Sequence, residues 1–231
     1  MPPGRSLSSS LRITRGAMLI AFLEIGVSLV WMMSNPESRR LLSDWLVATP
    51  QTVWREGKVW TLVTTALIEQ RFLSLMLQMF VLWSFVPTLE RFWGTPRFLR
   101  FALATSVAGA TAGTLCGLLL GQDGAILGLD PFVYSAIVAF GIIYRSQPVQ
   151  FFAVLPLTGR QLMIGILGFA SLFVLLQGLW ALGAAFAGAI LTAVLLLSKR
   201  WSPSILWKRW RLQRMRRHLK VVRDEPEKWL N

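Results

Sequence analysis

The chain has 231 residues, of which 54% are hydrophobic and only 15% are charged. This composition excludes a soluble globular domain and a disordered chain, and it predicts a polytopic membrane protein. A single cysteine, Cys116, and a single histidine, His218, exclude internal disulfides, zinc sites and Cys-X-X-Cys redox chemistry by count alone. We therefore expect no metal and no other cofactor.

Before the first apolar segment, residues 1–15 form a basic tail without acidic residues. An organellar transit peptide has the same composition, but the shortness of this segment favours a plain cytoplasmic tail. After the first span, residues 34–58 mix charges with Trp45 and Trp54. That pattern suits the lipid headgroup layer, so we expect short interfacial helices there.

Six apolar segments are predicted to cross the membrane, some of them short because neighbouring helices rather than lipid cover them. The last two form one apolar stretch that is too long for a single crossing, and we divide it near Gly178 and Gly183. The predicted fold class is all-α, a polytopic membrane protein with a six-helix transmembrane bundle. The expected spans are 16–33, 71–88, 98–120, 131–145, 161–177 and 179–198.

Small residues recur at four-residue spacing in the third span, at Gly109, Gly113 and Gly117. Ala184 and Gly188 repeat this pattern in the last span. Such stripes allow membrane helices to approach closely. We expect packing inside one bundle rather than a homodimer; the oligomeric state itself is not predicted.

Basic residues account for the net charge of +13, and 11 of the 24 lie in residues 199–231. Most of the others lie in alternate loops, which predicts that both termini are cytoplasmic. This distribution indicates membrane orientation, so we expect no nucleic acid as a partner. The domains are then the tail 1–15, the membrane domain 16–198 and a basic tail 199–231, whose amphipathic pattern favours anionic lipid over a protein partner.

Several motifs fall in a consistent order between about residues 40 and 198. They include a Trp before "TLVTT", the Leu-Glu-Arg and Trp-Gly loop at 89–94, the loop "QPVQFFAVLPLTGRQLMIG" and the sequence "ALGAAFAG". As a series they resemble the rhomboid family of intramembrane proteins. The resemblance implies a rhomboid-like six-helix domain, and in active members a serine and a histidine that cleave transmembrane substrates.

The resemblance also implies which positions would carry that chemistry. The Gly-x-Ser-Gly turn becomes "GLDP", so that Asp130 replaces the nucleophile, and Ala181 replaces the histidine base. The His and Asn that assist the oxyanion become Ser74 and Gln78. We therefore predict no catalytic residues, with Asp130, Ala181, Ser74 and Gln78 as degenerate family positions. Ser135, five residues after Asp130, would face about 140° away on a helix.

Two acidic residues need a separate explanation. Asp130 followed by Pro131 is a helix-start signal, and we interpret Asp130 as an N-cap. Glu24 lies within the first span, where an unpaired charge costs about 2.5 to 3.5 kcal/mol on insertion scales. We expect Glu24 to have a polar partner on the second helix. The alternative is that Glu24 belongs to a proton relay. An acid dyad would need Glu24 or Glu69 beside Asp130, for which the rhomboid arrangement gives no reason.

The function predicted from the sequence is that of a pseudoprotease. It would bind or hold transmembrane segments of client proteins in a groove between the second and fifth spans, with membrane lipids as its other partners. The alternatives are an intramembrane endopeptidase with an unorthodox site, and a small-molecule or ion carrier suggested by Glu24. We expect a bacterial inner membrane, with an organellar membrane as the alternative.

Overall fold

The structure is a computed structural model that describes residues 14–146, 148–151 and 155–198. The expectations for the two terminal tails, including the amphipathic C-terminal helix, lie outside the described residues. Within the described part, the chain is an all-α polytopic membrane protein, as predicted. The six apolar helices are α1 (Arg15–Met33), α4 (Phe72–Trp93), α5 (Thr95–Leu120), α6 (Asp130–Ile143), α7 (Gly159–Gln177) and α8 (Trp180–Leu197).

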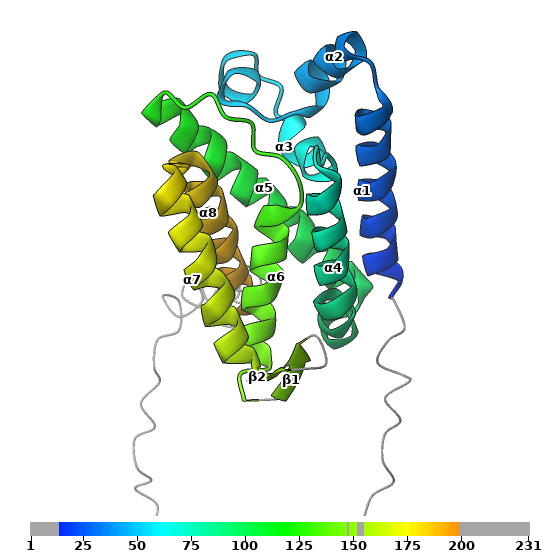
Figure 1. Cartoon of the computed structure of the whole chain (residues 1–231), viewed down its shortest axis with the longest axis vertical. Coiled ribbons are helices and arrows are strands. Elements are labelled where there is room, and N and C mark those ends of the chain that lie inside the picture. The colour runs from blue at the N-terminus through cyan, green and yellow to red at the C-terminus, as the bar shows by residue number, and fades with distance from the viewer. Residues whose placement is uncertain (1–13, 147, 152–154, 199–231) are drawn as a thin grey trace, which may run out of the picture. The chain divides into compact units, whose positions relative to one another are not determined.

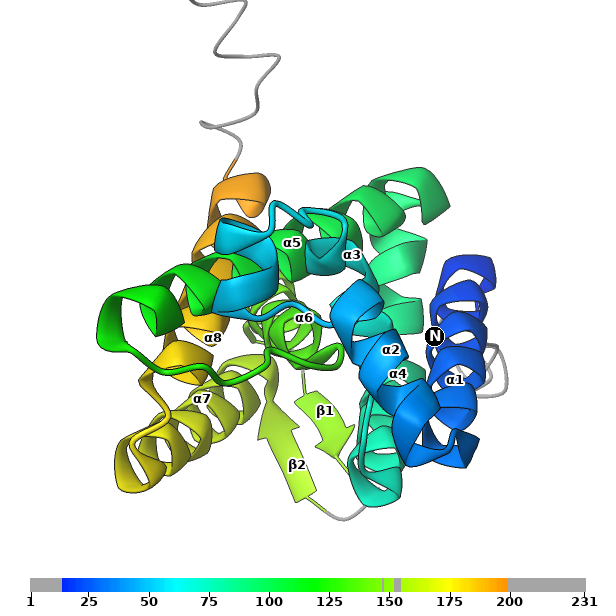
Figure 2. The ribbon, with the colours of Figure 1, turned by 90° about the horizontal axis from the view of Figure 1, so that it is seen from above.

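Five of these helices are long and apolar enough to cross a membrane, and α6 is the shorter one. Its 14 residues make a helix about 21 Å long, which is less than the thickness of a bilayer core. Helix α6 packs against α4, α5 and α7, and Figure 2 shows it in the middle of the bundle, with α1 outside α4. Neighbouring helices therefore cover α6 where lipid covers the longer ones.

Short helices join α1 to α4 at one end of the bundle, as the sequence predicted (Figure 1). Trp45 stacks on Trp60 with ring centroids 6.0 Å apart, and the Lys58 ammonium lies 5.6 Å from the Trp45 ring. These helices and turns are α2 (Pro36–Leu46), η2 (Gln51–Arg55), α3 (Thr61–Thr64) and η3 (Thr65–Leu67).

A hairpin at the other end of the bundle was not predicted from the sequence. Strands β1 (Pro148–Phe151) and β2 (Leu155–Thr158) pair antiparallel, with Pro148 opposite Thr158. Helix α7 begins with a capping box. The backbone N–H of Gln161 donates to Thr158 Oγ1, and the backbone N–H of Thr158 donates to the side-chain oxygen Oε1 of Gln161. This cap satisfies two backbone groups at the point where the chain re-enters the bundle.

Glu90 connects the end of α4 to the beginning of α1. One carboxylate oxygen accepts from the Gly16 N–H at 2.8 Å and the Thr95 hydroxyl at 2.6 Å. The other oxygen accepts from the Ala17 N–H at 2.8 Å and from the Thr14 hydroxyl. The negative charge thus lies on the positive N-terminal end of α1, which the helix dipole favours.

The small residues of α5 pack inside the bundle, as expected. A Cβ atom added at Gly109 would lie 2.5 Å from the Pro131 Cβ of α6 and 3.1 Å from the Ala185 carbonyl of α8. At Gly113 it would lie 2.8 Å from the Ala185 Cβ. On the α8 side of the same contact, a Cβ at Gly188 would lie 2.5 Å from the Ala112 Cβ of α5. Helices α5, α6 and α8 therefore approach so closely that only hydrogen fits at these positions.

The chain turns between α7 and α8 at Gly178, where the sequence predicted a break. Gly178 has a φ of +64°, in the left-handed region that glycine adopts without a steric penalty. Gly183, the other predicted turn residue, instead lies within α8, where an added Cβ would come 2.7 Å from Val174. It is a packing residue against α7.

We expect Gly109→Ala to destabilise the folded protein by about 1 to 3 kcal/mol, because the added methyl group overpacks the contact with Pro131. Gly168→Ala is the matched control, since nothing lies within 4 Å of a Cβ at that position on α7. The control should be neutral or stabilising, because alanine is the better helix former. Thermal unfolding in detergent measures both variants, and equal midpoints would contradict this packing.

Candidate functional site

Asp130 is the first residue of α6, and Leu129 is the N-cap. The N-cap interpretation of Asp130 was therefore wrong by one position, although the helix does begin there with Pro131 in its first turn. The Asp130 carboxylate accepts a hydrogen bond from Gln78 Nε2 at 2.7 Å. It is held by a side chain of α4 rather than by backbone groups of its own helix.

The loop before α6 is hydrogen-bonded to the segment between α1 and α4, and this sets the position of Asp130. The Ile126 N–H donates to the Ala48 carbonyl at 3.1 Å, and the Gly128 N–H donates to the Thr65 carbonyl at 3.1 Å. The Thr65 hydroxyl donates to the Ile126 carbonyl. Gly128 has a φ of +76°, and a Cβ there would lie 2.8 Å from Glu69 Oε2.

Gln78 joins two acidic side chains that are far apart in the sequence. Its Nε2 donates to Asp130 and also to Glu69 Oε2, at 3.1 Å. The second oxygen of Glu69 accepts the backbone N–H groups of Gln70 and Arg71, at 3.0 and 3.1 Å. Both N–H groups of the amide are thereby used, since an amide nitrogen offers two donors.

Glu24 of α1 lies within electrostatic reach of Glu69 and Asp130. Its side chain is completely buried, and neither carboxylate oxygen accepts a hydrogen bond within the described residues. It interacts electrostatically with both Glu69 and Asp130. The expected polar partner on the second helix is therefore absent from this part of the chain. Glu69 shares the Gln78 amide with Asp130, although the rhomboid arrangement gave no reason for the two to come together.

We call Glu24, Glu69, Asp130 and Gln78 the acidic cluster. No group of three His, Cys, Asp or Glu side chains in the part of the chain that the structure describes is arranged to hold a metal ion. In the sequence, the position of the ionisable Glu24 within an apolar span was a signal of this cluster. The role of Glu69 depends on the loop geometry just described, which no local pattern reveals.

Within the described residues, the other positions marked by the rhomboid resemblance, Ala181 and Ser74, form no hydrogen bond with Asp130, and nor does Ser135. Ala181 is buried with Ile126 and Ala185 in an apolar cluster. Ser74 is half-buried on α4. Ser135 is fully buried, and its hydroxyl donates to the Pro131 carbonyl at 2.8 Å. The absence of catalytic residues stays a prediction.

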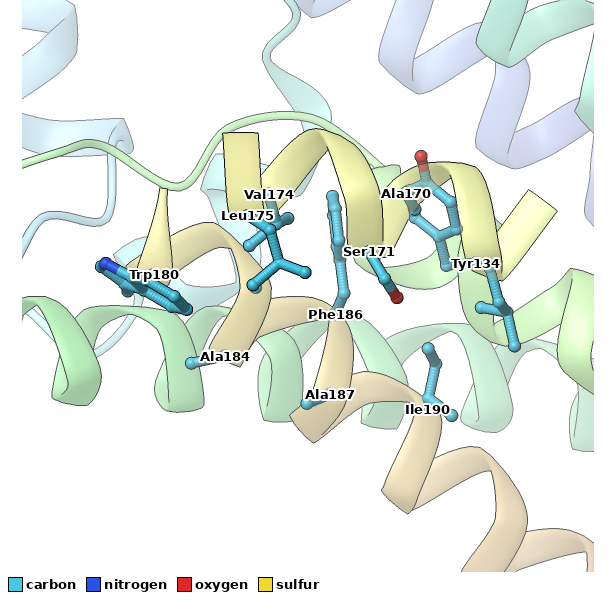
Figure 3. Close-up of a pocket in the computed structure, with 12 residues that line it drawn as sticks. Tyr134, Ala170, Ser171, Val174, Leu175, Trp180, Ala184, Phe186, Ala187 and Ile190 are labelled. Atoms are coloured by element: carbon cyan, nitrogen blue, oxygen red, sulfur yellow. The ribbon is translucent and has the colours of Figure 1, made fainter. Parts of the chain in front are cut away.

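An apolar groove of about 430 Å³ lies between α7 and α8, with Tyr134 of α6 at its side (Figure 3). Trp180 lies at one end and Ile190 towards the other, with Ala184 and Ala187 between them along α8. From the sequence we expected a groove between the second and fifth spans, whereas this groove lies between the fifth and sixth apolar helices, α7 and α8. A second groove of about 380 Å³ lies between α1 and α4.

Tyr134 lies one helical turn after Asp130 and connects the acidic cluster to this groove. Its ring packs on Phe186 with centroids 4.3 Å apart, and it interacts electrostatically with Asp130. Residues four apart share one face of a helix. One face of α6 thus borders both features.

The fold and the site together define an integral membrane protein with several apolar helices, a buried acidic cluster and a lateral apolar groove. Residues 15–195 match a family described as eukaryotic integral membrane protein (DUF1751), and the chain belongs to that family. No curated protein matches the chain. Because the family is eukaryotic, it does not support the bacterial inner membrane expected from the sequence. The cytoplasmic position of both termini stays a prediction.

We expect Gln78→Leu to destabilise the protein by about 3 kcal/mol, because it leaves the buried Glu69 carboxyl group and the half-buried Asp130 carboxyl group without their shared donor. Gln70→Leu is the control, since its side chain is exposed beside the same segment. Denaturant titration in detergent measures both. A Gln78→Leu variant as stable as the control would show that the amide does not hold the cluster together.

Proposed function

We propose that this protein is a rhomboid-like pseudoprotease that binds transmembrane segments of client proteins and does not cleave them. The motifs that occur in rhomboid-like order between about residues 40 and 198 support the rhomboid part of the proposal. The groove between α7 and α8 supports the binding part. This groove is the main observation in favour of the proposal.

The groups available at the head of α6 argue against hydrolysis. Residues 14–198 contain no histidine, and a serine nucleophile needs a base within hydrogen-bond reach. The nearest serine, Ser135, is buried and donates to its own helix. A carboxylate at the position of Asp130 would also repel a developing oxyanion, which requires donors and positive potential.

The lining of the groove suits a helix that lies in the membrane. Its two walls are helices long and apolar enough to cross a bilayer, so its occupant must be apolar along this length. Both walls of the groove contain small residues, which are Ala170 on α7 and Gly183, Ala184 and Ala187 on α8. Small residues let helix backbones approach closely, which is the main source of helix association in lipid. A transmembrane segment fits these requirements better than a soluble ligand.

We expect a photoreactive residue at Ala187 to crosslink to single-span client segments in native membranes. Ala187 lines the groove and is exposed. The same residue placed at Phe22 of α1, which is 80% exposed and lines neither groove, should give lipid adducts alone. A panel of co-expressed reporter segments, analysed by gel mobility and mass spectrometry, provides the measurement.

Filling the groove tests whether the crosslink depends on it. Ala184→Leu should reduce crosslinking at least tenfold, because the longer side chain occupies the space between α7 and α8. Gly26→Leu adds the same side chain on α1, where nothing lies within 4 Å, and should change nothing. Lipid adducts alone at Ala187, or equal crosslinking with and without Ala184→Leu, would refute the binding role.

We also expect no covalent labelling by fluorophosphonate or isocoumarin probes, and no cleavage of model transmembrane substrates. A histidine-containing active rhomboid protease under the same conditions serves as the positive control. Reproducible labelling or cleavage would favour the endopeptidase alternative. If that cleavage were then lost in Asp130→Ala, an unorthodox carboxylate mechanism would replace this proposal.

A further inference from the structure

Three buried oxygen atoms of the acidic cluster have no hydrogen-bond partner among the residues that the structure describes. They are both carboxylate oxygens of Glu24 and Oε1 of Gln78. Glu24 is 0% exposed and Gln78 is 4% exposed. Burying an ionised carboxylate without a partner is among the most costly arrangements in a protein, and more so in a membrane. Something must therefore compensate these acceptors.

The charged and titratable groups around Glu24 do not provide that compensation. Glu69, from the segment before α4, and Asp130, from α6, both interact with Glu24 and are both acidic. Arg71, the residue before α4, interacts electrostatically with Asp130 and has an exposed side chain. Tyr134 on α6 is the remaining titratable group that faces Asp130. If fully ionised, the cluster would place three negative charges against one positive charge.

The hydrogen bonds of Gln78 determine what a group bound here would have to supply. Gln78 uses both amide hydrogens on Glu69 and Asp130, so only its acceptor oxygen remains. The unpaired atoms are all acceptors, and the missing ligand must therefore supply a donor or a positive charge. A metal ion would need several oxygen atoms around one point, and the described residues contain no such group of acidic side chains. A proton needs only one carboxyl group and one acceptor.

We propose that the acidic cluster is a proton-binding site in which Glu24 carries the proton and the folded protein retains it at neutral pH. A protonated Glu24 gains the O–H donor that the cluster lacks, and it lowers the buried negative charge by one. The site draws on α1, the segment before α4, α4 itself and α6. It is independent of the client-binding role, because none of the four cluster residues lines the groove.

The test is the pH dependence of thermal unfolding of the full chain in detergent micelles. Because the folded protein holds a proton that the unfolded chain releases to neutral solution, the equilibrium constant for unfolding should rise by up to about tenfold per pH unit. The unfolding midpoint should thus fall as the pH rises from 6 to 8. Glu24→Gln should remove this dependence, since an amide supplies donors and does not titrate.

Glu37→Gln is the matched control, because Glu37 lies exposed on α2 and should leave the pH dependence unchanged. Infrared spectroscopy of the wild-type protein at pH 7 keeps the proposal falsifiable if Glu24→Gln does not fold. It should show the C=O stretching band of a protonated carboxyl group shielded from deuterium exchange. Absence of that band, or a pH dependence retained in Glu24→Gln, would overturn the proposal. A sodium-specific rise of the midpoint at constant pH that Glu24→Gln abolishes would replace the proton by a metal cation.

Discussion

The close approach of α5 to α6 and α8 is the contact on which the rest of this structure depends. Gly109 and Gly113 leave room for Pro131 and Ala185, and Gly188 leaves room for Ala112. Lipid tails are as apolar as leucine, so membrane helices gain little from hydrophobic burial against each other and rely on close packing. The short helix α6 can lie in the centre of the bundle only because its neighbours come this near.

That central position has an electrostatic consequence. It brings Asp130, at the head of α6, to Gln78 of α4, and the bound loop at Gly128 brings Glu69 to the same amide. Glu24 of α1 then lies within electrostatic reach of both carboxyl groups. A bundle that excludes water must satisfy such groups internally. The proposed proton would supply the donor that the buried acceptor atoms of this cluster lack.

Hydropathy and turn residues predicted the elements of this fold well, because both are local properties. The six apolar helices, the turn at Gly178 and the short helices after α1 follow from runs of apolar residues and from single breakers. The β1–β2 hairpin did not, since it depends on pairing between two short segments. The N-cap was predicted one residue too late, at Asp130 instead of Leu129. The Asp130 carboxylate accepts a hydrogen bond from Gln78 of α4 instead of capping its own helix.

The sequence by itself determined an all-α membrane bundle, the small-residue face of α5 and the lack of a histidine among residues 14–198. These are matters of composition and spacing, which a chain carries before it folds. Only the tertiary structure decided that Glu24, Glu69 and Asp130 share one buried site, and that the groove lies between α7 and α8. Residues 24, 69 and 130 come together through loop geometry and helix packing, and neither leaves a periodic signal in the sequence.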